Sequence, residues 1–256
     1  MMNRRELVLL VGGAMTAARA SRAEQKAIPL IGFFNPTSPG PLAPYVAAFR
    51  QSPAAFYDSR TMAAMHRAWG NEAWSADPGY LQALGRRMAH ATGPILECGS
   101  GLTTIVVGVL AELRGVPVLS LEQDAWWANF VQSELSRLNI KQVKVMHTPL
   151  SAYDGFLWYD VTDVKLPDSF ELAICDGPAI YGKPEPYQSA WRVGLLPVLR
   201  DRGVRVDEIL LDDADDARLG PLLARWREQH HLLTEIARTE TGTYLIARAG
   251  ALANDS

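Results

Sequence analysis

The segment Ile95–Gly101, which reads Ile-Leu-Glu-Cys-Gly-Ser-Gly, constrains the fold of this chain more than any other part of it. An apolar run that ends in two closely spaced glycines predicts a buried strand, a tight turn and then the start of a helix. Glycines in such a turn let the backbone approach a ligand, and the first N–H groups of the helix point at that ligand. The segment therefore predicts a ligand site beyond the end of a buried strand.

From about residue 70 onward, short apolar runs alternate with amphipathic stretches, which is typical of a parallel sheet with helices on both faces. Asp77 and Pro78 predict a helix start, because aspartate caps helices and proline suits their first position, and this helix is expected to end near residue 92. Further helices are expected over residues 103–114 and 125–138. The expected strands cover residues 95–98, 118–121, 143–146, 172–175, 209–211 and 244–247, with 231–237 as a further candidate.

Two acidic residues flank the glycine turn. Glu97 stands just before it, and Glu122 ends the next expected strand, where a carboxylate can accept hydrogen bonds from both ribose hydroxyls of a nucleoside. The dinucleotide-binding pattern needs a third glycine where this chain has Thr104, which disfavours NAD. A carboxylate before the loop repels phosphates and attracts a cationic aminoacyl group. The residues therefore favour S-adenosylmethionine as the ligand.

Residues 70–250 resemble the class I S-adenosylmethionine-dependent methyltransferases in four stretches: LECGSGLTT, LSLEQD, AICDGP and ILLDDADD. The chain is most similar to a bacterial branch in which E-x-G-S-G-x-[ST]-T, W-Y-D and D-G-P occur together, here with Trp158–Asp160 and Asp176–Pro178. It differs from many members in having Thr103 where they have a third glycine. The resemblance implies an α/β, Rossmann-like, doubly wound fold with a mostly parallel seven-stranded sheet and helices on both faces.

The resemblance also implies roles for individual residues. Asp176 ends the fourth expected strand, near the transferred methyl group, and is the predicted catalytic residue, as a general base or an orienting group. Glu97 would contact the methionine end of the cofactor directly or through water, and Glu122 would accept the ribose hydroxyls. The loop His147–Ser151 would meet the adenine. The predicted cofactor-binding residues are Glu97, Gly99, Ser100, Gly101, Glu122, Gln123 and Asp176.

Asp176 is also a candidate metal ligand together with Asp212 and Asp213, because carboxylates at neighbouring strand ends suit Mg²⁺. Some class I O-methyltransferases that resemble catechol methyltransferases place three oxygen ligands in these loops. The alternative is structural: Asp212 and the acids after it cap the next helix, while Asp176 anchors the Gly177–Pro178 turn. Two roles are likewise possible for Asp124: a contact with the adenosine or the N-cap of the next helix.

Aromatic residues are candidates for the wall of the site. The segments Tyr153–Asp168 and Ile180–Tyr187 are expected to form a lid over the pocket or, alternatively, a satellite core. Trp126 and Trp127 open a helix, and at least one of them should be buried, because neighbouring helical residues point about 100° apart. Trp126 is also a candidate for stacking on the ligand.

The two cysteines, Cys98 and Cys175, are too few for a disulfide scaffold and are not spaced like a zinc site. The resemblance implies that the first and fourth strands are neighbours, which places both thiols near the cofactor. Adjacent parallel strands rarely offer good disulfide geometry, so both thiols are expected to be reduced and packed.

The first 53 residues are expected to form a signal-like leader and a Pro-rich linker, with the methyltransferase domain at residues 54–256. Arg4 and Arg5 precede an apolar run of about 12 residues, which indicates twin-arginine export but is shorter than the roughly 20 residues of a membrane span. Six prolines between residues 28 and 53 are expected to interrupt any helix and leave one short strand, Ile28–Phe33. Residues 1–50 also resemble the N-terminus of ABC-transporter substrate-binding proteins.

Together these features predict a methyltransferase that modifies a small molecule or a sugar, at oxygen. The net charge of −3 gives no sign of a nucleic-acid binder. Two alternatives stay open: an exported solute-binding component, indicated by the leader alone, and an NAD-dependent oxidoreductase. S-adenosylmethionine is made in the cytosol, which favours a cytoplasmic protein, whereas the leader argues for export. The sequence does not indicate an oligomeric state.

Overall fold

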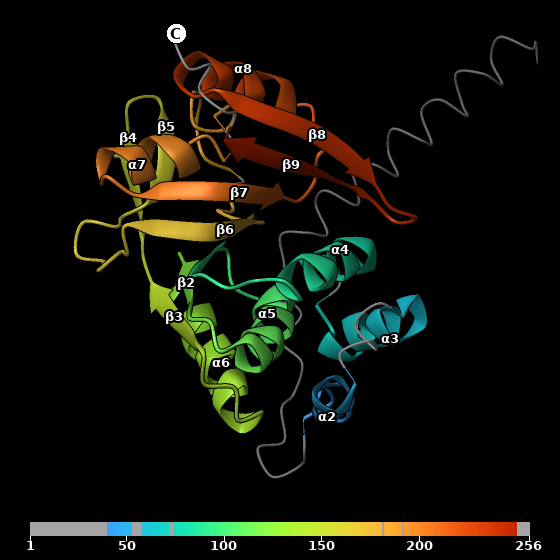
Figure 1. Ribbon diagram of the computed structural model, residues 1–256. Coiled ribbons are helices and arrows are strands. Elements are labelled where there is room, and N and C mark those ends of the chain that lie inside the picture. Colours follow the sequence, from blue (N-terminus) through green and yellow to red (C-terminus); the bar gives the residue numbers. More distant parts are fainter. Residues whose placement is uncertain (1–39, 53–57, 72–73, 181, 191, 250–256) are drawn as a thin grey trace, which may run out of the picture.

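The computed structural model describes residues 40–52, 58–71, 74–180, 182–190 and 192–249. Its main sheet has seven strands in the order β3-β2-β1-β6-β7-β9-β8 (Figure 1). The strands from β3 to β7 in this order are parallel, and β9 is antiparallel to both of its neighbours. The reversed last strand distinguishes this sheet from the 3-2-1-4-5-6 order of dinucleotide-binding folds. The predicted doubly wound, mostly parallel seven-stranded sheet is confirmed.

The strands expected from residue 95 onward are all present. They are β1 Ile95–Cys98, β2 Val118–Glu122, β3 Val143–His147, β6 Ser169–Cys175, β7 Arg205–Leu211, β8 Leu232–Arg238 and β9 Thr243–Ala249. The strands β6 and β7 begin earlier than expected, because their first residues include polar side chains that an apolar pattern does not count. Cys98 and Cys175 are register partners on β1 and β6, and both are buried and free, as predicted.

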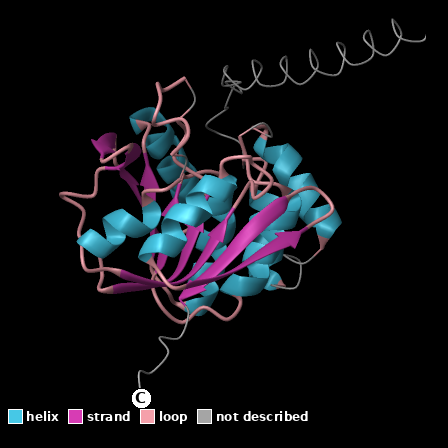
Figure 2. Ribbon diagram, turned by 90° about the horizontal axis from the view of Figure 1, so that it is seen from above, coloured by secondary structure: helices cyan, strands magenta, loops and turns pink. Residues whose placement is uncertain are grey.

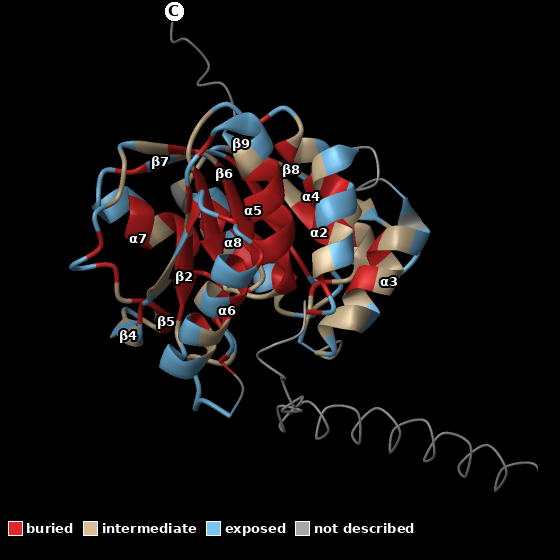
Figure 3. Ribbon diagram, turned by 90° about the horizontal axis from the view of Figure 1, so that it is seen from below, coloured by how far each residue is buried: buried red, intermediate tan, exposed pale blue. Residues whose placement is uncertain are grey.

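Helices cover both faces of the sheet (Figure 2). They are α4 Pro78–Met88, α5 Leu102–Arg114, α6 Ala125–Arg137, α7 Leu195–Asp201 and α8 Leu219–Gln229. Alternate strand residues serve two apolar clusters, as a period of two requires: Ile95 packs with α4, α5 and α6, whereas Leu96 packs with α7 and α8. Figure 3 shows the consequence, with the central strands and α5 buried and the outer helices partly exposed. In the described part of the chain, no helix is long and apolar enough to span a membrane.

Residues 40–52 contradict the expected irregular linker. They contain α2 (Ala43–Gln51), which is followed by α3 (Ser59–Trp69). Pro44 lies in the first turn of α2, where the N–H that proline lacks would have no partner within the helix. Val46 and Phe49 are buried in the same cluster as α4 and α5, so the predicted boundary at residue 53 does not separate two cores here. The twin-arginine segment and the strand expected at 28–33 lie outside the described residues.

The segment expected to be a lid instead forms a second, two-stranded sheet. Its strands are β4 (Leu150–Tyr153) and β5 (Phe156–Tyr159), which pair antiparallel. Phe156 and Trp158 are buried in the cluster with α7 and α8. The strand β5 therefore packs into the main core on this face of the sheet rather than into a separate satellite core, and a lid role for the rest of the segment stays a prediction.

Candidate functional site

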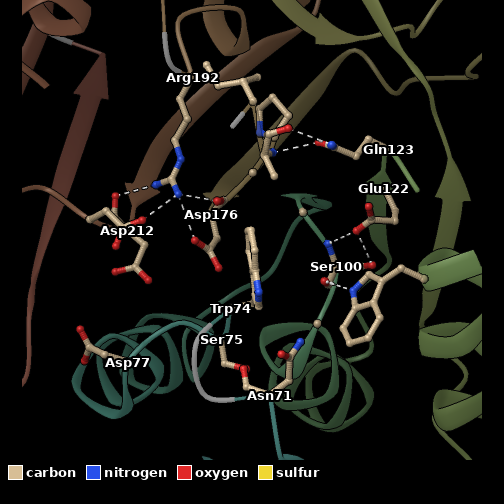
Figure 4. A pocket seen from close by; sticks show the side chains of 18 of the residues that line it. Asn71, Trp74, Ser75, Asp77, Ser100, Glu122, Gln123, Asp176, Arg192 and Asp212 are labelled. Atoms are coloured by element: carbon tan, nitrogen blue, oxygen red, sulfur yellow. Dashed lines mark hydrogen bonds and ion pairs between the residues drawn. The ribbon is translucent and has the colours of Figure 1, made fainter. Parts of the chain in front are cut away.

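A cavity of about 610 Å³ lies beyond the carboxyl ends of β1, β2, β6 and β7, which is where open parallel sheets bind ligands. Figure 4 shows Ser100 and Glu122 at one end, Arg192 and Asp212 at the other, and Asp176 between them. Most of the predicted cofactor residues line this cavity, namely Gly99, Ser100, Gly101, Glu122, Gln123 and Asp176.

The glycine turn between β1 and α5 forms one wall of the cavity. Gly99 has a φ of 95°, a conformation that favours glycine, and a Cβ there would lie 2.8 Å from the backbone nitrogen of Gly177. Gly101 differs, because a Cβ there would meet no atom within 4 Å. Its N–H donates a hydrogen bond to Thr104 Oγ1 at 2.8 Å, at the start of α5. The turn is therefore packed tightly at Gly99 and open at Gly101.

Glu122 holds this turn against the end of β2. Its Oε2 accepts hydrogen bonds from the N–H and the hydroxyl of Ser100, at 3.0 and 2.8 Å, and its Oε1 accepts one from the Asp124 N–H at 3.0 Å. The side chain is buried, which raises the pKa of the carboxyl. The Ser100 hydroxyl can rotate, so it is the donor that a ligand hydroxyl can replace.

Glu97 does not line the cavity, so its expected contact with the methionine end of a cofactor, direct or through water, stays a prediction. Its side chain is 0% exposed, because β1 is covered on both faces. Its Oε2 accepts hydrogen bonds from Thr104 at 2.8 Å and Ser120 at 2.5 Å. Burial raises the pKa of Glu97 to about 7, since lost hydration outweighs these hydrogen bonds. Glu97 is connected to the glycine turn through Thr104, whose hydroxyl accepts a hydrogen bond from the Gly101 N–H.

The residues after Glu122 close the wall between two loops. The Gln123 amide donates to the carbonyl of Ala179 and accepts from its N–H, both at 2.9 Å, which ties the loop after β2 to the loop after β6. Asp124 accepts a hydrogen bond from the Trp127 N–H at 2.8 Å as the N-cap of α6, and it also lines the cavity. The cap predicted for Asp124 is confirmed, and Gln123 lines the cavity with its amide bonded to the backbone.

Arg192 lies where the sequence predicted a metal ion. Its buried Nη2 lies 3.0 Å from both Asp176 Oδ1 and Asp213 Oδ2, and its Nη1 donates to the carbonyl of Asp212 at 2.6 Å. Among the residues that the structure describes, no group of three His, Cys, Asp or Glu side chains could hold a metal. The guanidinium supplies the positive charge between the predicted ligands Asp176, Asp212 and Asp213, so nothing here supports Mg²⁺.

Asp212 directly follows β7 and lines the cavity with only 4% of its surface exposed. Its backbone N–H donates to the carbonyl of Cys175 at 3.0 Å. Its carboxyl, in contrast, has no hydrogen-bond or ion-pair partner within the described segments. Burial raises the pKa of this carboxyl well above its usual range, and the charges of Asp176 and Asp213 raise it further.

The segment before α4 reaches the site, which the sequence did not predict. Asn71, Trp74, Ser75 and the α4 cap Asp77 line the cavity, and Trp74 lies near Asp176 in Figure 4. The one signal that could have indicated this is the tryptophan-rich stretch just before the Asp-Pro cap.

Neither Trp126 nor Trp127 is fully buried, although the spacing predicts that at least one should be: Trp127 is partly buried against the core, and Trp126 is exposed. Trp127 donates from Nε1 to the Ser100 carbonyl at 2.8 Å and packs edge-on against Trp69. Trp126 is 60% exposed and stacks on Phe130, although it also lines the cavity. The residues expected to meet the adenine, His147–Ser151, are not among those that line the cavity.

No family model and no curated protein matches this chain. Among solved structures, the SAH-bound methyltransferase PaMTH1 of Podospora anserina matches with a TM-score of 0.53 at 12% identity, over 92% of this chain and 96% of that one. The delta-N METTL16 methyltransferase domain matches with 0.51 at 14% identity, over 79% and 98%. The N-terminal domain of human METTL16 matches with 0.50 at 14% identity, over 89% and 99%. These likenesses show that the chain has the fold of S-adenosylmethionine-dependent methyltransferases.

Proposed function

We propose that this protein is a class I methyltransferase that uses S-adenosylmethionine. The observation that carries the proposal is the bonding of Glu122 to Ser100 at the ends of the first two parallel strands, beside the open space over Gly101. In this fold a carboxylate at that strand end is placed to accept ribose hydroxyls. The structural neighbour PaMTH1 is described as SAH-bound, which supports a ligand of the same class here.

The residues present fit this cofactor. Glu122 would bind the ribose as the Ser100 hydroxyl rotates away, and the backbone from Gly99 to Gly101 would cradle the aminoacyl chain. The acidic side chains of the cavity attract a sulfonium, which they would not do for a pyrophosphate. When bound, S-adenosylmethionine supplies an electrophilic methyl group on its sulfonium sulfur.

Asp176 would orient the acceptor at the centre of the cavity. Its Oδ1 is held 3.0 Å from Arg192, which fixes the carboxylate in one position. Alignment and exclusion of water contribute more to methyl transfer than covalent help does, so a positioned carboxylate suffices for this role. The expectation of an oxygen acceptor rests on Asp176 alone.

We propose a small-molecule acceptor, in the cytoplasm where the cofactor is made. Of the charged residues that line the cavity, seven are acidic and two, Arg192 and Arg218, are basic. Both arginines are paired with aspartates. A phosphate backbone would be repelled by this lining, which argues against a nucleic-acid acceptor. The acidic residues are Asp77, Glu122, Asp124, Asp176, Asp212, Asp213 and Asp215.

Calorimetric titration tests the proposal. Wild-type protein is expected to bind S-adenosylhomocysteine, and Glu122→Gln to bind it about 10- to 100-fold more weakly, because a charged acceptor for two hydroxyls is lost. Glu235→Gln, an exposed change on β8, is the matched control and should bind as the wild type does. Folded protein that takes up NAD instead, or a Glu122→Gln variant with unchanged affinity, would contradict the assignment.

A further inference from the structure

Five aspartates line the end of the cavity at β6 and β7, against two arginines, Arg192 and Arg218. Arg192 forms ion pairs with the side chains of Asp176 and Asp213, but it reaches Asp212 only at the backbone carbonyl. Asp77 and Asp215 add two further carboxylates to the same lining. A further positive charge in this end of the cavity would therefore be stabilised.

Asp212 is the group that such a charge would meet. A carboxyl that is 96% buried is costly when ionised and unpaired, and this one lines the cavity without a hydrogen-bond partner in the described part of the chain. A cation bound beside this carboxyl would offset that cost by pairing with the ionised form.

Aromatic side chains border the same cavity. Trp69, Trp74, Trp126 and Trp127 are among the lining residues, and Figure 4 places Trp74 between Asp176 and Asn71. Faces of tryptophan rings attract organic cations and also pack against apolar carbon. Carboxylates and tryptophans together suit a ligand that carries both a positive charge and an apolar body.

The position of Asp212 separates this ligand from the cofactor. The cofactor is proposed to lie at Ser100 and Glu122, and Figure 4 shows Asp212 at the opposite end, beyond Asp176. The ribose contact proposed for the cofactor at Glu122 therefore lies away from Asp212. The unpaired carboxyl belongs to the side of the cavity from which the acceptor would approach.

Building on the proposed function, we infer that the methyl acceptor is an organic amine, whose ammonium group pairs with the carboxylate of Asp212 beside the tryptophan side chains. The ammonium nitrogen gives a proton to Asp212, and its lone pair then forms the new N–C bond. The electron pair of the broken C–S bond stays on sulfur, and the proton leaves Asp212 for water. An amine acceptor replaces the oxygen acceptor expected from the sequence.

Two probes of equal size test the inference by calorimetry: 2-phenylethylamine, which is charged at neutral pH, and 2-phenylethanol, which is not. Each is titrated into wild type, Asp212→Asn and Asp163→Asn, with and without S-adenosylhomocysteine. Asp163 is exposed and does not line the cavity, so its variant carries the same charge change elsewhere. The wild type and Asp163→Asn should bind the amine at least about tenfold more tightly than the alcohol, and Asp212→Asn should lose that preference.

Asp212→Asn preserves the shape of the side chain, and its affinity for S-adenosylhomocysteine should equal that of the wild type, which shows that the site is folded. Equal binding of the two probes by the wild type, or a preference that persists in Asp212→Asn, would overturn the amine assignment. Failure of the wild type to bind S-adenosylhomocysteine would instead overturn the proposed function. The two failures are thereby distinguishable.

Discussion

Glu122 and Asp212 are two carboxyls in comparable positions with opposite surroundings. Both stand at the carboxyl end of a parallel strand, both are buried, and burial raises the pKa of both. Glu122 accepts three hydrogen bonds from its own neighbourhood, whereas the Asp212 carboxyl accepts none within the described residues. The first carboxyl is bonded within its own loop, and the second is the one that we propose to pair with the methyl acceptor.

The two ends of the cavity also differ in how they are assembled. The Glu122 end comes from one strand–turn–helix unit and the strand beside it, so its parts are close in sequence. The Asp212 end combines the cap of α4, the ends of β6 and β7, Arg192 and the turn before β9. The stability of an end built from distant segments should depend more on the residue that joins them. That residue is Arg192.

Replacing Arg192 should have the largest effect. Arg192→Met leaves the carboxylates of Asp176 and Asp213 without their buried counter-ion, and we expect a loss of about 3–5 kcal/mol in the free energy of unfolding. Urea denaturation measures this loss. The control is Arg218→Met, on the same cavity wall, whose guanidinium is more exposed than that of Arg192 and whose pair with Asp216 should contribute below about 1 kcal/mol. Similar losses of unfolding free energy in the two variants would show that the Asp212 end does not depend on Arg192 in particular.

A methyl group added at Gly101 should weaken cofactor binding at the Glu122 end and leave the Asp212 end unchanged. Gly101→Ala puts a Cβ into space that the cofactor is proposed to occupy, and overpacking of this kind costs about 1–3 kcal/mol, or about 5- to 150-fold in affinity for S-adenosylhomocysteine. Gly220→Ala, in α8, adds a methyl to open space away from the cavity and should leave affinity unchanged. Binding by Gly101→Ala at wild-type strength would place the cofactor elsewhere.

The smallest effect concerns Glu97, which lies beneath the turn. Its pKa of about 7 in the folded protein exceeds the ordinary 4.5, so between these values the folded state keeps a proton that the unfolded state has released. Stability therefore falls as the pH rises through this window. Glu97→Gln cannot titrate, and the fall between pH 5 and pH 8 should shrink by about 1–3 kcal/mol, measured by denaturation at both pH values. Glu122 and Asp212 contribute with the same sign, so part of the slope should persist; parallel curves would refute the burial argument.

The parts of this molecule that sequence predicted are those with local causes. The strand–turn–helix around Gly99, the strand ending at Glu122 and the caps Asp77 and Asp124 each follow from neighbouring residues. The hairpin of β4 and β5 also had a local signal, the Asp154-Gly155 pair between two apolar runs, which is typical of a two-residue turn.

Arg192 had no such signal. It lies in an irregular segment before α7, and no spacing rule relates it to Asp176 or Asp213, which come from other strands. Three aspartates at neighbouring strand ends predict a metal site when the acidic residues are considered alone. The sequence does not show that the fold brings the guanidinium of Arg192 to them instead. The same limit applies to Trp74, which the path of the chain before α4 carries to the site.

The reversal of β9 has a consequence for how the pocket can vary. Because β8 and β9 run in opposite directions, the turn between them lies at the edge where the parallel strands end, and Thr241, Gly242 and Thr243 line the cavity there. Both arms of this hairpin are anchored in the sheet, so residues can be inserted at its tip without moving the register of β1, β2 or β6. Changes in the length or sequence of this one loop can thus alter how far the pocket extends on that side. The strands that hold the glycine turn need not change.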